Sequence, residues 1–113
     1  MENQNNQVLD RQTLYQKNAE NYTSKNIKSI EYEIKIYLII GSEKYSHKAK
    51  ILKAITYKNG VKKKTLVGQA KRDFNGNWKV MGISDNELIR KKLIAGNSFT
   101  KQGLEYFGLD KVA

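Results

Sequence analysis

Basic side chains are concentrated in one segment of the sequence. The 29 residues from Lys44 to Arg72 contain ten Lys or Arg side chains and no Asp or Glu. The other 84 residues contain eleven basic and eleven acidic groups, so the formal net charge of +10 comes entirely from this segment. A charge distribution of this kind attracts polyanions, and phosphate groups bind lysine through charge without needing a sequence motif.

The sequence therefore predicts a surface that binds nucleic acid. The predicted phosphate contacts are Lys48, Lys50, Lys58, Lys62, Lys63, Lys64, Lys71 and Arg72. Trp78 is the predicted base-stacking residue, and Tyr57 and Phe74 could stack as well if they are exposed. Of the 21 cations, eighteen are Lys and three are Arg, which favours binding that does not read base sequence and weakens with salt. Two alternatives remain: an acidic protein surface as the partner, or a solvated face that only keeps the protein soluble.

No other residues form a recognisable catalytic or metal-binding set. His47 is the single histidine and the chain has no cysteine, so we interpret it as a packed or edge histidine. Glu31 and Glu33 share one strand face and could act as an acid–base pair in a cleft, but a solvated face opposite lysines is the simpler interpretation. The sequence has no Walker, dinucleotide-binding or G-x-S-x-G motif. We expect a protein that is not an enzyme and uses no cofactor or metal.

The first half of the chain reads as a tail, a helix and a strand. The polar residues 1–6 are expected to be a disordered tail, and residues 7–113 a single domain. Residues 7–22 have an apolar stripe at helical spacing, which predicts an amphipathic helix. In residues 30–40 every even position is apolar, which predicts a strand with one continuous apolar face. The aromatic residues of the helices and of this strand are expected to pack, and Tyr37, on the polar side of the strand, is the exception whose exposure has to be checked.

Two Asn-Gly pairs predict two tight hairpins. Asn59-Gly60 and Asn75-Gly76 suit two-residue type I′ turns, in which both residues have positive φ. Counting back from the second turn pairs Ala70 with Met81. This register predicts one apolar face and a second face where lysines alternate with other residues, among them Trp78 and Val80. The result is a four-stranded antiparallel meander in which the basic residues lie on paired strands.

Helices are expected after the sheet. Ser84 and Glu87 have the spacing of a capping box, with the helix ending at Gly96 or Asn97. A further short helix is predicted from Thr100 to Phe107. The predicted fold class is α+β: a four-stranded antiparallel meander with an N-terminal helix and one or two C-terminal helices packed on one face.

The two hairpin sequences resemble those of a known family. Residues 58–61 and the run Asn75-Gly76-Asn77-Trp78-Lys79-Val80-Met81-Gly82-Ile83 are similar to the closing strands of NTF2-like domains, which often read dGkWkV.gI, and of VirB8-like proteins. The resemblance spans residues 30–83 and implies a curved antiparallel sheet and an assembly role in conjugation, secretion or mobile-element systems. The chain departs from the family in having one predicted helix before the sheet and two after it, and the resemblance implies no catalytic residue.

Compartment and assembly follow from what the sequence lacks. The longest apolar run, residues 37–40, is too short to span a membrane, and the absence of cysteine fits a reducing compartment. We expect a cytoplasmic bacterial protein without membrane insertion. The alternative is an extracytoplasmic domain of a longer, membrane-anchored parent. Either is compatible with a homo-oligomer.

Overall fold

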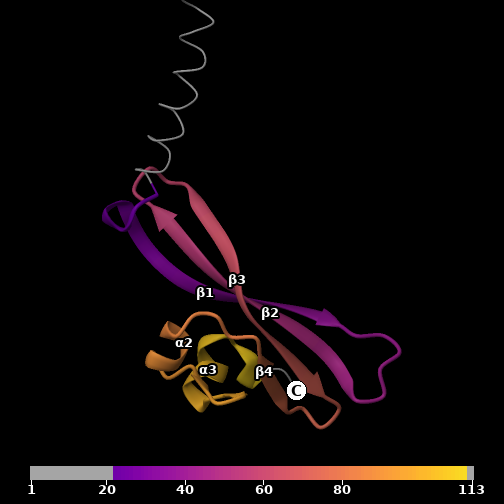
Figure 1. The fold of residues 1–113 in the computed structure, drawn as a ribbon. Helices are drawn as coiled ribbons and strands as arrows, with labels where there is room; N and C mark the ends of the chain where they lie inside the picture. Colours follow the sequence, from indigo (N-terminus) through magenta and orange to yellow (C-terminus); the bar gives the residue numbers. More distant parts are fainter. Residues whose placement is uncertain (1–21, 112–113) are drawn as a thin grey trace, which may run out of the picture. The chain divides into compact units, whose positions relative to one another are not determined.

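A computed structural model describes residues 22–111 (Figure 1). The elements follow in the order η1 (Ser24–Asn26), β1 (Ile27–Leu38), β2 (Tyr45–Tyr57), β3 (Lys62–Asp73), β4 (Trp78–Met81), α2 (Glu87–Arg90), β5 (Ile94–Ala95), β6 (Ser98–Phe99), α3 (Lys101–Tyr106) and η2 (Leu109–Lys111). The predicted tail 1–6 lies outside the described residues, and so does the predicted helix 7–22 except for Tyr22.

The long strands form the predicted meander. Four strands make one antiparallel sheet in the order β1-β2-β3-β4, and β5 pairs with β6 in a separate two-stranded sheet. The described chain divides into two compact units: the first contains residues 22–31 and 55–63, and the second contains 32–54 and 64–111. The antiparallel sheet and the short helices confirm the α+β class.

The second unit contains the main hydrophobic core. The buried members of this core are Tyr32, Ala49, Ile51, Val67, Ala70, Val80, Leu88, Leu93, Ile94, Phe99 and Leu109. The first six come from β1–β4 and the others from the segment after the sheet, so burial of apolar area joins the sheet to the short elements that follow it. The N–H of Val80 donates to the carbonyl of Asn97 (2.6 Å), which covers the outer edge of β4.

The first unit is small and has an aromatic contact of its own. The rings of Tyr22 and Tyr57 meet edge to face at 4.9 Å, and Tyr57 is buried. The N–H of Lys58 donates to the carbonyl of Asn26 (2.7 Å). This bond ties the hairpin turn to the residue that precedes β1.

Both hairpin turns are one residue longer than predicted. Tyr57 N–H donates to the carbonyl of Val61, and Gly60 N–H donates to the carbonyl of Tyr57, each at 2.9 Å. Gly60 has a positive φ of 88°. Lys92 is the one non-glycine residue of the described chain with a positive φ, so Asn59 and Asn75 both have a negative φ. Because the asparagine before the glycine keeps a negative φ, the type I′ prediction is wrong. The loop has three residues, with glycine in the left-handed position.

The same three-residue loop shifts the register of β3 and β4. Asp73 N–H donates to the carbonyl of Asn77 (2.9 Å), and the strands then pair Ala70 with Val80. The predicted pairing of Ala70 with Met81 is therefore wrong by one residue. Since a one-residue shift moves each side chain to the other face, Val80 lies in the core and not among the lysines.

The segment after the sheet differs from the predicted long helix. α2 has only four residues, and Asp85, not Ser84, accepts the N–H of Glu87 (3.0 Å). Ser84 instead donates its N–H to the carbonyl of Val67 (2.9 Å), so the capping-box prediction is wrong. Gly96 does not end a helix, because it begins the two-residue turn between β5 and β6, with a φ of 60°.

The last predicted helix is present as α3. Thr100 is its N-cap residue, and the hydroxyl oxygen of Thr100 accepts the N–H of Gly103 (2.9 Å). The helix is followed by Gly108, whose φ of 71° suits a glycine at a helix end.

β1 is shifted towards the N-terminus relative to the predicted strand 30–40, and its apolar face is only partly covered. Tyr32 is 5% exposed, but Ile36, Leu38 and Ile40 are 40%, 67% and 90% exposed. Among residues 22–111, β1 has one strand neighbour, β2, so this apolar end lies at an edge of the described sheet.

Candidate nucleic-acid interface

Strand alternation in the second unit places lysines on the face of the sheet that points away from the core. In β2, Ala49 and Ile51 are buried, so Lys48 and Lys50 point to the opposite side and are exposed. In β3 and β4, Ala70 lies opposite Val80 in the core. The neighbouring pair, Lys71 opposite Lys79, therefore points away from the core.

Tyr37 lies between two of these lysines. Its ring centroid is 5.9 Å from the Nζ of Lys48 and 5.6 Å from the Nζ of Lys50, within the range of a cation–π interaction. Tyr37 is 40% exposed, in keeping with its place on the polar side of the strand. An exposed aromatic ring flanked by two ammonium groups can contact both a base and the phosphates beside it.

Tyr45 also lies near two lysines, but its side chain is half-buried. The Nζ atoms of Lys44 and Lys71 each lie 5.3 Å from its ring centroid. The two tyrosines and their lysines, together with Lys79, are called the lysine–tyrosine face below: Tyr37, Tyr45, Lys44, Lys48, Lys50, Lys71 and Lys79. Within the described chain, none of these lysines forms an ion pair with a carboxylate.

The pair of Lys71 and Lys79 is unfavourable in the protein alone. Like charges directly opposite each other on neighbouring antiparallel strands destabilise the pairing. The Nζ of Lys71 lies 5.3 Å from the ring centroid of Tyr45, on the neighbouring strand β2.

The other predicted lysines are distributed differently. Lys58, Lys62 and Lys63 are exposed but belong to the first unit, where the Nζ of Lys63 lies 3.5 Å from the ring centroid of Tyr22. Lys64 is in the second unit and forms an ion pair with Glu33 (2.8 Å). Lys48, Lys50 and Lys71 are the predicted phosphate contacts that lie together on the lysine–tyrosine face.

Arg72 and Trp78 lie on the other side of the sheet. They pair directly across β3 and β4, two residues from the buried pair of Ala70 and Val80, so their side chains share the face of the core. The ring of Trp78 meets that of Phe99 edge to face at 6.1 Å. Trp78 is therefore remote from the lysines that it was expected to accompany.

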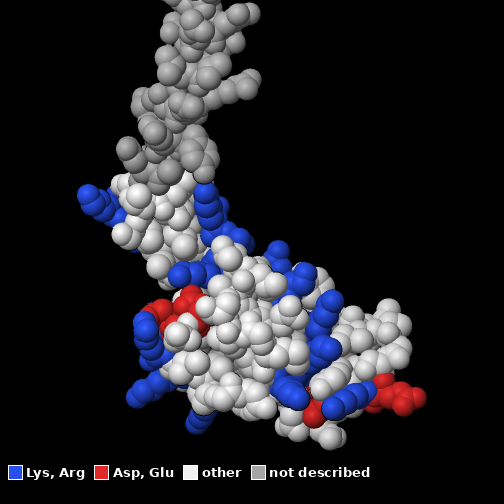
Figure 2. All heavy atoms as spheres, in the orientation of Figure 1, with Lys and Arg blue, Asp and Glu red and all other residues white. Residues whose placement is uncertain are grey.

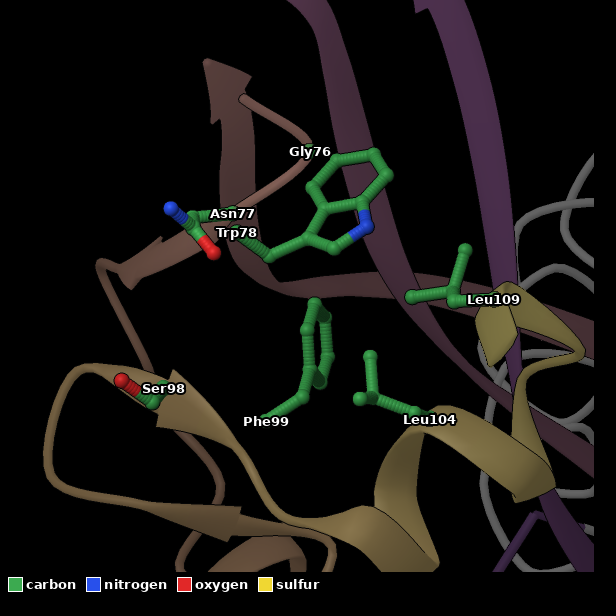
Figure 3. A pocket seen from close by; sticks show the side chains of 7 residues that line it. All are labelled: Gly76, Asn77, Trp78, Ser98, Phe99, Leu104 and Leu109. Carbon is green, nitrogen blue, oxygen red and sulfur yellow. The ribbon is translucent and has the colours of Figure 1, made fainter. Parts of the chain in front are cut away.

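Trp78 instead lines a pocket, shown in Figure 3. The pocket has a volume of about 390 Å³ and is lined by Gly76, Asn77, Trp78, Ser98, Phe99, Leu104 and Leu109. Figure 3 shows the indole ring, Phe99 and the two leucines converging on it, with Asn77 and Ser98 to one side. None of the residues that line this pocket is titratable.

A hydrogen-bonded network fixes the sheet to the start of α2. The Tyr32 hydroxyl donates to Asp85 Oδ2 (2.7 Å), and the Nζ of Lys53 lies 3.3 Å from the same oxygen. Burial raises the pKa of Asp85, but hydrogen bonds from Tyr32, from Glu87 N–H and from Lys53 outweigh it, so the pKa of Asp85 is below its usual value. Burial and the Asp85 carboxylate raise the pKa of Tyr32, which remains a hydroxyl donor. Lys53 is thus engaged by Asp85.

The remaining titratable candidates form no reactive cluster in the described chain. Nδ1 of His47 is 2.9 Å from the hydroxyl oxygen of Ser46. Glu33 is paired with Lys64, and no group of three or more His, Cys, Asp or Glu side chains that could hold a metal ion is found among residues 22–111.

Sequence reasoning missed several members of the lysine–tyrosine face. Lys79 alternates with Val80 and would have been found if the three-residue turn had been recognised, because the correct register places it opposite Lys71. Lys44 and Tyr45 precede the region of β2 that has clear alternation, so the sequence gives no comparable signal for them. Figure 2 shows Lys and Arg side chains over both units and acidic atoms in a few small groups.

The comparisons with known proteins give no further guidance. No family model, curated protein or solved structure matches this chain. Within residues 22–111, no helix has the length and apolar character needed to cross a membrane. The function is therefore inferred from the residues of the interface.

Proposed function

We propose that this protein is a non-enzymatic module that binds nucleic acid through the lysine–tyrosine face. The observation that supports this most is the bracketing of two tyrosine rings by pairs of lysines, on a face whose lysines have no carboxylate partner in the described chain. Ammonium groups bind phosphates, and the rings between them offer flat apolar surface to bases. An acidic protein surface would use the charges but would have less use for the rings.

The composition of the face favours binding that ignores base sequence. All five of its cations are lysines, which act as point charges and lack the planar fork by which arginine recognises guanine. If all five contact phosphates of a single strand, log K falls against log salt with a slope of about −3.5. Salt dependence therefore measures how many of these lysines take part.

The tyrosines favour a single strand over a duplex. In a duplex the base faces are stacked inside the helix, where a side chain on a β-sheet cannot reach them, while in a single strand the bases are free to stack on an aromatic ring. Tyr37 is the better candidate for stacking, because it is 40% exposed. Loss of one base-stacking contact corresponds to a decrease in affinity of between about 5-fold and 150-fold.

The test is fluorescence anisotropy with labelled single-stranded and double-stranded oligonucleotides across a NaCl series. The informative variant is Lys48→Glu with Lys50→Glu, and its matched control is Lys91→Glu with Lys101→Glu, at exposed positions after the sheet. Each exchange removes two charge units, so both variants have a net charge of +6 in place of +10. We expect the first variant to lose binding and lower the magnitude of the slope, and the control to retain most of the affinity.

Two outcomes would refute the proposal. The first is no binding by the natural sequence at low salt. The second is an equal loss of affinity in both variants, which would reduce binding to net charge. Displacement by polyglutamate as effective as displacement by an oligonucleotide would instead favour an acidic protein partner. For the role of the ring, Tyr37→Leu should weaken binding to the single strand alone, and Tyr37→Phe, which keeps the ring, is the control. Phe74 is 63% exposed in the β3–β4 turn, so Phe74→Leu tests its predicted stacking separately.

A second candidate function is an assembly domain of the NTF2-like or VirB8-like kind, in a conjugation, secretion or mobile-element system. The observation that favours it is the exposed apolar end of β1, at an edge of the sheet. The hairpin residues that carry the resemblance include all of β4. This candidate requires that the edge of β1 has a partner, and the two functions are compatible in one molecule.

A further inference from the structure

We propose that β1 pairs with β1 of a second copy of this chain, so that two sheets join edge to edge. The proposal does not depend on nucleic-acid binding. It begins from the apolar side chains that β1 leaves exposed: Ile36 is 40% exposed and Leu38 is 67% exposed. An edge strand of this kind, with apolar side chains and no strand on its outer side within residues 22–111, is a template for pairing with another strand.

Two hydrogen bonds show which backbone groups of β1 point outwards. The N–H of Ile39 donates to the carbonyl of Ser46, towards β2 (2.9 Å). The N–H of Tyr32 donates to the hydroxyl of Tyr106, away from β2 (3.1 Å). Because N–H groups alternate along a strand, the even-numbered residues of β1 direct their backbone groups outwards.

These bonds also limit the free length of the edge. Tyr106 of α3 occupies the outward side at Tyr32, and β1 ends at Leu38. The edge that can accept another strand therefore runs from Ile34 to Leu38, and its central residue is Ile36. An antiparallel pair related by a two-fold axis at Ile36 uses this whole length.

The side chains are complementary in this register. Ile34 of one copy lies opposite Leu38 of the other, and Ile36 lies opposite itself, so apolar residues meet apolar residues on the core-side face. On the other face, Lys35 lies opposite Tyr37, which already contacts two lysines in its own chain. Moving the axis by one residue, to Lys35, would place two Lys35 side chains directly opposite each other, and like charges in that position are unfavourable.

A second copy is therefore the partner that this edge fits. The pairing buries the exposed isoleucine and leucine side chains and satisfies the outward backbone groups of the edge. The interface is short, so we expect a reversible dimer and not a permanent one.

The test is sedimentation equilibrium of the whole protein over a wide concentration range. The chain has a mass of 13.0 kDa, and we expect a concentration-dependent rise towards twice this mass. Ile36→Lys places two lysines at the two-fold axis and should weaken dimerisation at least about 100-fold. The matched control is Ile30→Lys, because Ile30 is 41% exposed on the same strand but lies beyond the paired length. Circular dichroism verifies that both variants fold.

The absence of cysteine allows a second measurement. Ile36→Cys creates a single thiol that should form a disulfide-linked dimer on oxidation, since directly opposed residues of an antiparallel pair lie within disulfide range. Ile30→Cys should form it far more slowly. A monomer at all concentrations would overturn the proposal, and so would a dimer that Ile36→Lys does not weaken. Equal disulfide formation by the two cysteine variants would contradict the proposed register.

Discussion

Replacing Asp85 by alanine tests the network that fixes the sheet to the start of α2. The carboxylate has 14% of its side-chain surface exposed and accepts three hydrogen bonds or ion contacts, from the Tyr32 hydroxyl, Glu87 N–H and Lys53 Nζ. The hydroxyl of Tyr32 is the partner that suffers most, because Tyr32 is 5% exposed. Removing Asp85 leaves this hydroxyl without its partner in a place that water reaches poorly.

The size of the effect follows from the separate contacts. A buried hydroxyl that loses its partner costs about 1–3 kcal/mol, and loss of the side-chain acceptor at the start of a helix costs about 1 kcal/mol. The ion contact with Lys53 adds little, because the side chain of Lys53 is 27% exposed. We therefore expect Asp85→Ala to lower the free energy of unfolding by about 2–4 kcal/mol, measured by urea denaturation. Asp110→Ala, at an exposed aspartate, is the control and should change it by less than about 0.5 kcal/mol.

The pH dependence gives a separate test of the carboxylate. The pKa of Asp85 is lowered in the folded state, so its charge stabilises the fold above the unfolded pKa of about 3.9. This stabilisation is lost as the pH falls through that value towards the folded pKa. The difference in unfolding free energy between the natural sequence and Asp85→Asn should therefore shrink below about pH 4. A difference that stays constant from neutral to acidic pH, or a negligible effect of Asp85→Ala, would refute this account of the network.

The remaining predictions concern two glycines that have little space for a side chain and the N-cap residue of α3. Gly103→Ala should cost about 3 kcal/mol, because its Cβ would overlap the backbone carbonyl of Leu93, which is held in place by the N–H of Thr100 (3.1 Å). Gly68→Ala should cost only about 1 kcal/mol, because its Cβ meets the flexible end of Ile83; equal losses in the two alanine variants would contradict this distinction. Thr100→Ala should lose about 1–2 kcal/mol through the missing N-cap of α3, with Thr100→Ser as the control that restores it in thermal unfolding.

The sequence was sufficient for the topology of the sheet. Alternation along β1 and β2 and the two Asn-Gly pairs predict four antiparallel strands in sequence order, and the structure has this order. Strand order depends on local patterns that repeat over many residues, so an error at one position does not change it. Thr100 likewise marks the start of α3 because a hydroxyl at an N-cap has a local effect.

The register and the faces could not be obtained in the same way. They depend on the φ angle of one asparagine in each turn, and an Asn-Gly pair fits both a two-residue turn and a three-residue turn with glycine last. The wrong choice placed Trp78 among the lysines, whereas the structure places it beside Phe99. Ser84 shows a related difficulty. In the predicted capping box its hydroxyl and its N–H would both take part at the start of a helix. In the structure both donate to the carbonyl of Val67, which is distant in sequence.

The two proposals make a joint prediction, because the proposed pairing preserves the faces of the sheet. A two-fold axis perpendicular to a sheet leaves the same face of both copies on the same side, so two lysine–tyrosine faces would form one surface. A single strand that spans both copies would then bind more tightly than one that contacts a single copy, and it would stabilise the dimer by the same factor.

Ile36→Lys adds positive charge, so charge alone predicts tighter binding of nucleic acid. If the dimer is the binding form, the variant instead binds a long single strand more weakly while its affinity for a short strand is retained. If Ile36→Lys binds the long and the short single strand more tightly than the natural sequence does, the lysine–tyrosine face acts in single copies.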